Sequence, residues 1–148
     1  MKIIDLENQT DLTINIDTLE EIAQGLTMRE IELIVTDNKS IQALNNEHRS
    51  KNKATDVLSF PIDTTFGEAT IPDMPLGSIV ISADLAKERS AELGHTVENE
   101  LSLLFIHGLL HLLGFDHEVD DGEMRNKEKN IIETFALPSS LIVRTEEY

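Results

Sequence analysis

Nearly every residue from Leu101 to Leu113 is apolar. A helix on a protein surface shows one apolar stripe, whereas this stretch is apolar almost all round and must be buried. Thr96 is suited to cap its N-terminus, and Glu98 puts a carboxylate in the first turn, where the helix dipole favours it. The stretch is too short, and too interrupted by histidines, to span a membrane. The sequence therefore predicts a helix that runs through the core.

Three of the five histidines belong to this helix or follow it directly. His107 and His111 are four residues apart, which puts both imidazoles on one helical face, one turn apart. Gly114 can end the helix in a left-handed conformation and let the chain bring His117 back toward the pair. Three converging imidazoles form a metal site with an open fourth position, typical of a catalytic zinc. The alternative is three structural histidines.

Composition narrows the chemistry further. The length of 148 residues predicts a single domain over 1–148, and the absence of cysteine leaves only histidine or carboxylate to hold a transition metal. The start of the chain lacks the pattern of a signal peptide, so we expect a cytoplasmic protein that binds no membrane. A formal net charge of −16 argues against nonspecific binding of nucleic acid. Arg49, Lys51 and Lys53 nevertheless form the densest basic cluster.

The hydrophobic pattern predicts an α+β fold with a four-stranded mixed sheet, about five helices and the histidine helix at its centre. Expected strands cover residues 2–7, 30–36, 57–60 and 76–81, with the later two added at an edge. Expected helices cover 18–28 with Asp17 as cap, about 38–48 with Asp37 or Asn38 at its start, 82–93 with Ser82 as cap, about 97–113, and a last one capped by Asp120 or Asp121. We expect residues 63–75 to form a mobile loop, because this segment contains prolines and a glycine that disfavour helices and strands.

The residue directly after the first helical histidine distinguishes peptide hydrolysis from phosphodiester cleavage. Zinc metalloproteases with the pattern His-Glu-x-x-His keep a glutamate beside the first histidine as general base, and here that position is Gly108. Peptide hydrolysis is therefore disfavoured. A phosphodiester has a better leaving group and anionic oxygens, which the guanidinium of Arg49 can bind in a bidentate manner.

Two segments resemble the signatures of the YbeY family, bacterial endoribonucleases of ribosomal RNA maturation. The first runs from His107 to His117, and the second from Asn45 to Pro61, centred on Arg49. The segment Leu76–Ser82 is also similar to a family segment, with Ser78 where an aspartate is common. The resemblance covers about residues 29–135.

The resemblance implies a zincin-like α+β fold and one Zn²⁺ per chain, bound by His107, His111 and His117. It implies Arg49 as the key basic residue of an enzyme that cleaves single-stranded ribosomal RNA. It also implies the ribosomal small subunit and assembly factors as partners, and a role in ribosome quality control. Two alternatives stay open: a noncatalytic, zinc-stabilised ribosome-assembly factor, and a zinc hydrolase of peptides or small molecules.

Further residues receive weaker expectations. Lys51 and Lys53 suit backbone phosphates, although solvated side chains are the simpler interpretation. Asp116 either contacts a metal ligand or only forms a turn, and Ser59 either faces the cleft or fills a strand. Glu100 is expected to line the groove at most. His48 and His95 are expected on the surface.

Overall fold

The computed structural model describes residues 2–62, 65–66, 69–70, 74–116 and 119–137. Its strands are β1 (Ile4–Asn8), β2 (Ile31–Thr36), β3 (Val57–Pro61), β4 (Thr65–Phe66), β5 (Ala69–Thr70) and β6 (Gly77–Ser82). Its helices are α1 (Ile16–Gln24), α2 (Asn38–Arg49), α3 (Ala83–Leu93), α4 (Val97–Leu112) and α5 (Glu123–Thr134). The predicted α+β class and the order of the main elements are confirmed.

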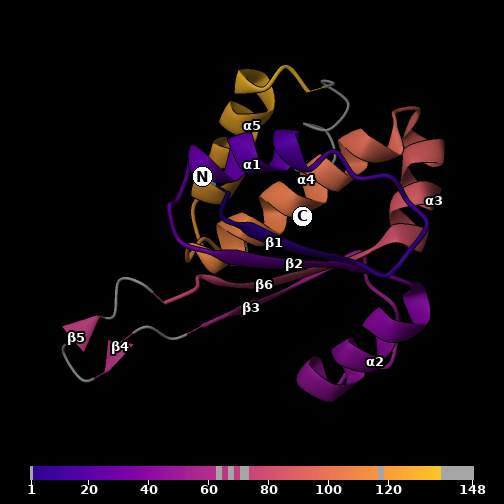
Figure 1. The fold of residues 1–148 in the computed structure, drawn as a ribbon, viewed down its shortest axis with the longest axis horizontal. Coiled ribbons are helices and arrows are strands. Elements are labelled where there is room, and N and C mark those ends of the chain that lie inside the picture. Colours follow the sequence, from indigo (N-terminus) through magenta and orange to yellow (C-terminus); the bar gives the residue numbers. More distant parts are fainter. Residues whose placement is uncertain (1, 63–64, 67–68, 71–73, 117–118, 138–148) are drawn as a thin grey trace.

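Four strands form the predicted mixed sheet in the order β1-β2-β6-β3. β1 and β6 both run parallel to β2, and β3 pairs antiparallel with β6 at the edge. Figure 1 shows α2 on one face of the sheet and α1, α4 and α5 on the other. The two later strands therefore join on one side of the early pair, as predicted, and β3 becomes an edge strand.

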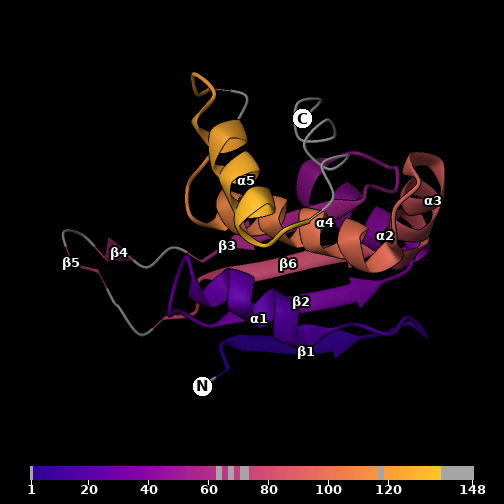
Figure 2. The same ribbon diagram turned by 90° about the horizontal axis from the view of Figure 1, so that it is seen from above.

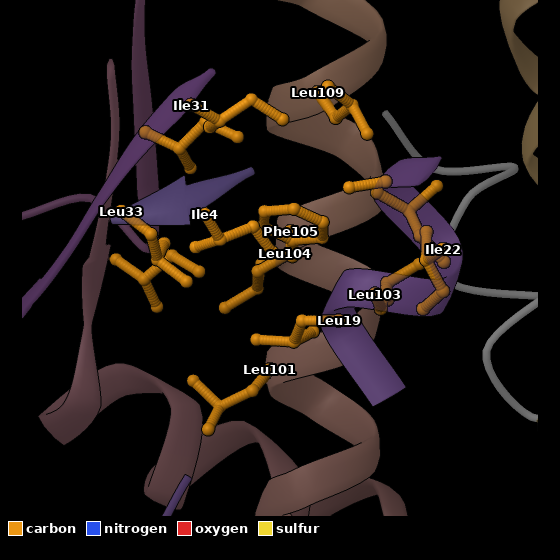
Figure 3. Packing of buried hydrophobic residues seen from close by; sticks show 14 of the residues in the cluster. Ile4, Leu19, Ile22, Ile31, Leu33, Leu101, Leu103, Leu104, Phe105 and Leu109 are labelled. Carbon is orange, nitrogen blue, oxygen red and sulfur yellow. The ribbon is translucent and has the colours of Figure 1, made fainter. Parts of the chain in front are cut away.

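The core lies between the sheet and α4. Leu103, Leu104, Phe105 and Ile106 are fully buried, so consecutive residues of α4 are enclosed on every side. Figure 3 shows Leu104 and Phe105 lying toward Ile4 and Leu33 of the sheet, with Leu19 and Ile22 of α1 near Leu103. The apolar stretch predicted from the sequence is thus the central helix of the fold, and α1 covers it from the outer side.

Helix boundaries differ from the prediction at two N-termini. α1 begins at Ile16 after Asn15 and ends at Gln24, so Asp17 lies in the first turn and the predicted range of 18–28 is shifted. At α5 the N-cap is Gly122, whose φ of 104° suits glycine, and no side chain caps it from that position. Asp120 instead accepts hydrogen bonds from the backbone N–H groups of Gly122 (2.8 Å) and Met124 (3.0 Å).

The other predicted caps are confirmed. Asp37 accepts from the Ser40 N–H at 2.8 Å, Ser82 from Leu85 at 3.2 Å and Thr96 from Asn99 at 3.1 Å. Each oxygen satisfies a backbone N–H that has no partner inside its helix. The backbone N–H of Ser40 is also the main reason that the pKa of Asp37 lies below its ordinary value.

A buried carboxylate attaches the N-terminal strand to α1. Glu20 accepts hydrogen bonds from the backbone N–H groups of Ile3 (3.0 Å) and Ile4 (2.8 Å), and Gln24 donates to it at 2.8 Å. Burial raises the pKa of Glu20, but these donors and Lys2 outweigh it and hold the pKa below its ordinary value. The ionised carboxylate is therefore part of the folded structure.

The segment 63–75, predicted as a mobile loop, lies partly outside the described residues. Its described part contains two short strands, β4 and β5, that pair antiparallel and extend away from the main sheet (Figures 1 and 2). The prediction missed this pairing because the segment lacks the length and alternation of a typical strand. In the portion of the chain with assigned structure, no helix is both long and apolar enough to cross a bilayer.

Candidate active site

A cavity of about 600 Å³ opens beside the C-terminal half of α4. It is lined by the end of α2, by β3 with the two residues before it, and by α4 with the turn after it. The lining residues are His48, Arg49, Thr55, Asp56, Val57, Ser59, Phe60, His107, Gly108, His111 and Asp116. The edge strand β3 thus borders the cavity.

The two helical histidines form one wall. Their Nε2 atoms are 3.1 Å apart, and their rings meet edge to face with an interplanar angle of 84°. This distance is less than twice the usual Zn–N bond length of about 2.0–2.1 Å, so one zinc ion can bind both nitrogens at once. The donor set therefore fits a transition metal that prefers imidazole.

The turn after α4 has the predicted form. Gly114 adopts a φ of 101°, the Gly114 N–H donates to the carbonyl of His111 and the Phe115 N–H donates to that of Leu110. Asp116 follows and lines the cavity. His117, the third predicted ligand, lies outside the described residues. Among those described, no third histidine, aspartate or glutamate completes a metal site with the pair.

Gly108 brings α4 close to the sheet at the level of the histidines. A Cβ atom on Gly108 would lie 2.9 Å from Cγ2 of Ile79 and 3.4 Å from Cγ2 of Val57. Side-chain carbons do not normally approach this closely, so a larger residue requires movement of α4 or of β6. The packing at Gly108 therefore leaves no space for the glutamate that zinc metalloproteases have at this position.

Arg49 lines the cavity because α2 ends beside it. Ser50 closes the helix in a left-handed conformation with a φ of 56°. The buried amide of Asn45 then donates to the carbonyl of Lys53 at 2.9 Å and fixes the following loop. The ring of His48 contacts Phe60 of β3 edge to face, with centroids 5.0 Å apart. Arg49 itself is exposed, and no hydrogen bond or ion pair joins its side chain to the rest of the described chain.

The other predicted site residues divide into two groups. Ser59 and Asp116 line the cavity together with Arg49 and the histidine pair. Lys51 and Lys53 are exposed on the loop after α2, outside the lining residues. The cavity also includes Thr55 and Asp56, which lie within the second signature segment but were not predicted as site residues.

Glu128 is a site residue that sequence reasoning missed. Its Oε1 atom lies 2.7 Å from Nδ1 of His107, and both side chains are buried. The sequence did contain a signal, because Glu128 shares the spacing of Met124, Ile131 and Ile132, the buried face of α5. A carboxylate on such a face needs a polar partner in the core.

Two expectations about the other end of α4 are wrong. The side chain of His95 is only 3% exposed and that of Glu100 is fully buried, and their Nε2 and Oε1 atoms are 2.9 Å apart. His95 is therefore not a surface residue, and Glu100 does not line the cavity. His48, also expected on the surface, keeps a side chain that is 47% exposed while it lines the cavity.

The fold and the cavity together define a class: a small α+β protein in which a buried helix presents two histidines to a polar cavity that an arginine also lines. Comparison with known proteins narrows this class. The sequence model of the family described as Endoribonuclease YbeY matches residues 2–136.

Named relatives support the same assignment. The Endoribonuclease YbeY of Sulfurovum sp. is 62% identical over 97% of this chain and 98% of its own. The Endoribonuclease YbeY of Nautilia profundicola is 56% identical over 97% of this chain and 99% of its own. The solution structure of TM1509 from Thermotoga maritima superposes with a TM-score of 0.60 and 27% identity, over 89% of this chain and 88% of that one. The chain belongs to the YbeY family.

Proposed function

We propose that this chain, as one domain, is a metal-dependent endoribonuclease that cleaves single-stranded RNA in ribosomal RNA maturation and ribosome quality control. Membership of a family named for endoribonuclease activity supports cleavage of RNA. The rest of the proposal rests on the cavity, which is lined by two imidazoles whose Nε2 atoms are 3.1 Å apart and by Arg49. A phosphodiester, with its anionic oxygens, suits a site that contains an arginine and imidazoles able to hold a metal cation.

In this proposal His107, His111 and His117 hold one Zn²⁺. A zinc ion with three imidazole ligands supplies a Lewis acid and lowers the pKa of a bound water to about 7. Arg49 binds two oxygens of the scissile phosphate and orients it toward the histidines, which a planar guanidinium does better than an ammonium. Lys51 and Lys53, exposed on the adjoining loop, bind the neighbouring phosphates, and Asp116 and Ser59 orient groups within the cavity.

The net charge of −16 supports a local mode of RNA binding. An acidic surface repels a polyanion, so RNA gains little from contacts far from Arg49 and the two lysines. Selection of one site on ribosomal RNA then depends on partners, for which we propose the small ribosomal subunit and its assembly factors. The same proposal assigns the enzyme to the cytoplasm.

The alternative of a peptide-hydrolysing zinc enzyme has less support. It requires a general base beside the first histidine, and Gly108 packs too closely against Ile79 for a side chain at that position. A noncatalytic assembly factor, in which a metal only stabilises the helix and its turn, differs from our proposal in one consequence: it predicts no cleavage of RNA.

Metal analysis and RNA cleavage on the same preparation test the proposal. We expect about one transition-metal ion per chain, cleavage of a single-stranded RNA, and loss of cleavage after chelation that Zn²⁺ restores. Analysis of the product ends identifies the nucleophile, because attack by the 2′-hydroxyl leaves a cyclic phosphate. Metal without cleavage would favour the noncatalytic factor, and cleavage by a preparation free of metal would contradict the proposed mechanism.

A further inference from the structure

Glu128 is the most unusual residue of the buried face of α5. It is 1% exposed and lies among Met124, Ile131 and Ile132, which hold α5 against α4. Burial of a carboxylate costs free energy unless polar groups compensate for it. Among the described residues, only its Oε1 atom has a hydrogen-bond partner, the Nδ1 atom of His107 at 2.7 Å, whereas Oε2 is buried without one.

The contact uses the nitrogen of His107 that faces away from the cavity. The other ring nitrogen, Nε2, lies 3.1 Å from Nε2 of His111, and both rings line the cavity. An ionised carboxylate can only accept a hydrogen bond, so the hydrogen of a neutral imidazole must then be on Nδ1. In that tautomer the lone pair of Nε2 points away from Glu128, toward the position next to His111.

We infer that Glu128 is a positioning residue that holds His107 in the Nδ1–H tautomer with its Nε2 lone pair directed at a metal ion. The inference rests on the proposed metal site. A carboxylate behind a ligating imidazole fixes the ring orientation and increases the donor strength of the opposite nitrogen. Glu128 therefore acts through His107, and it lies on a different helix, 21 residues further along the chain.

A purely structural role makes a different prediction. If Glu128 only joined α5 to α4, its replacement would lower the free energy of unfolding, because His107 would lose a buried hydrogen-bond partner, but it would leave the affinity for metal unchanged. Stability and metal affinity then separate the two roles. The positioning role requires that metal affinity falls even when the fold is retained.

The test compares Glu128→Leu and Glu128→Gln with wild type. Glu100→Gln is the matched control, because it changes the other buried glutamate paired with a histidine, about 10 Å away along α4. Titration with Co²⁺ and Zn²⁺ gives metal affinity. Long-range ¹H–¹⁵N correlation spectra of the metal-free protein at about pH 8, above the reference imidazole pKa of about 6.5, give the tautomer of His107.

We expect the Nδ1–H tautomer in wild type, and a Glu128→Leu protein that folds but binds Co²⁺ about 10- to 100-fold more weakly. Glu128→Gln keeps an accepting oxygen without the charge, so its affinity should lie between the two. Glu100→Gln should bind metal as wild type does.

An Nε2–H tautomer of His107 in wild type would overturn the inference, as would wild-type affinity in Glu128→Leu. If Glu128→Leu does not fold, Glu128→Gln decides: wild-type affinity in that variant would also overturn it. Wild type that binds neither Co²⁺ nor Zn²⁺ would refute the proposed metal site, and the tautomer measurement would then test Glu128 alone.

Discussion

Gly108→Ala tests whether α4 is pressed against the sheet beside the histidine pair. The new Cβ would lie 2.9 Å from Cγ2 of Ile79, a residue with no exposed surface. Overpacking of this kind costs about 1–3 kcal/mol, and the higher helix propensity of alanine returns about 1 kcal/mol. We therefore expect a net loss of up to about 2 kcal/mol, which lowers Tm by up to about 8 °C. Urea unfolding followed by far-ultraviolet circular dichroism measures it.

Two further variants make the test specific. In an Ile79→Ala background the contact atoms of Ile79 are absent, so Gly108→Ala should become stabilising by about the helix-propensity gain. Gly25→Ala is the matched control, because Gly25 has helical dihedrals and its added Cβ would meet no atom closer than 3.5 Å. Wild-type or higher stability of Gly108→Ala, with no dependence on residue 79, would refute the proposed packing.

The remaining predictions concern β1, the core and the metal. Glu20→Gln should lower the free energy of unfolding by about 1–3 kcal/mol at pH 7, because it weakens two buried hydrogen bonds to backbone N–H groups. Since the pKa of Glu20 is lowered in the folded state, its stabilisation is present above the unfolded pKa of about 4.3 and is lost as pH falls through the folded pKa. The difference from wild type in urea unfolding should thus shrink in acid, and a constant difference would contradict this. Phe105→Ala should cost about 3–5 kcal/mol, because the ring is fully buried; a loss below about 1 kcal/mol would contradict the central position of α4. His117→Ala should lose bound metal in elemental analysis, whereas unchanged metal content would remove His117 from the ligand set. Metal binding by wild type should weaken below about pH 6, since ligating imidazole must be neutral.

Local pattern was sufficient to predict α4 and the sheet. The stretch around Phe105 is apolar on all sides and has Thr96 at one end and Gly114 at the other, so its burial and both of its ends could be read directly. The strands of the sheet alternate or are continuously apolar, which distinguishes them from helices. The start of α1 was misjudged because an aspartate suits both the cap and the first turn, and Asp17 occupies the turn.

Two buried pairs were not predicted from the sequence. His95 was expected on the surface, although its partner Glu100 is only five residues away. Glu128 has the spacing of a buried position, but its partner His107 lies 21 residues away on another helix, and only the fold brings the two together. The histidine pair on α4 could be predicted because helical spacing alone brings His107 and His111 together. Arg49 lies in the densest basic cluster of the sequence and matches a family signature, but its place at the cavity depends on the fold, which ends α2 beside β3.

Cleavage of RNA by Arg49→Ala tests the central claim, that the scissile phosphate lies in the cavity between Arg49 and the histidines. The variant should keep its fold and metal content, because Arg49 is exposed and its side chain bonds to no other described residue. Loss of a charged hydrogen-bonding group should reduce cleavage about 10- to 100-fold. Arg49→Lys should recover little, because an ammonium lacks the bidentate fork. Arg89→Ala, which removes the same charge on α3 away from the lining residues, should cleave normally. Wild-type cleavage by Arg49→Ala would contradict the account.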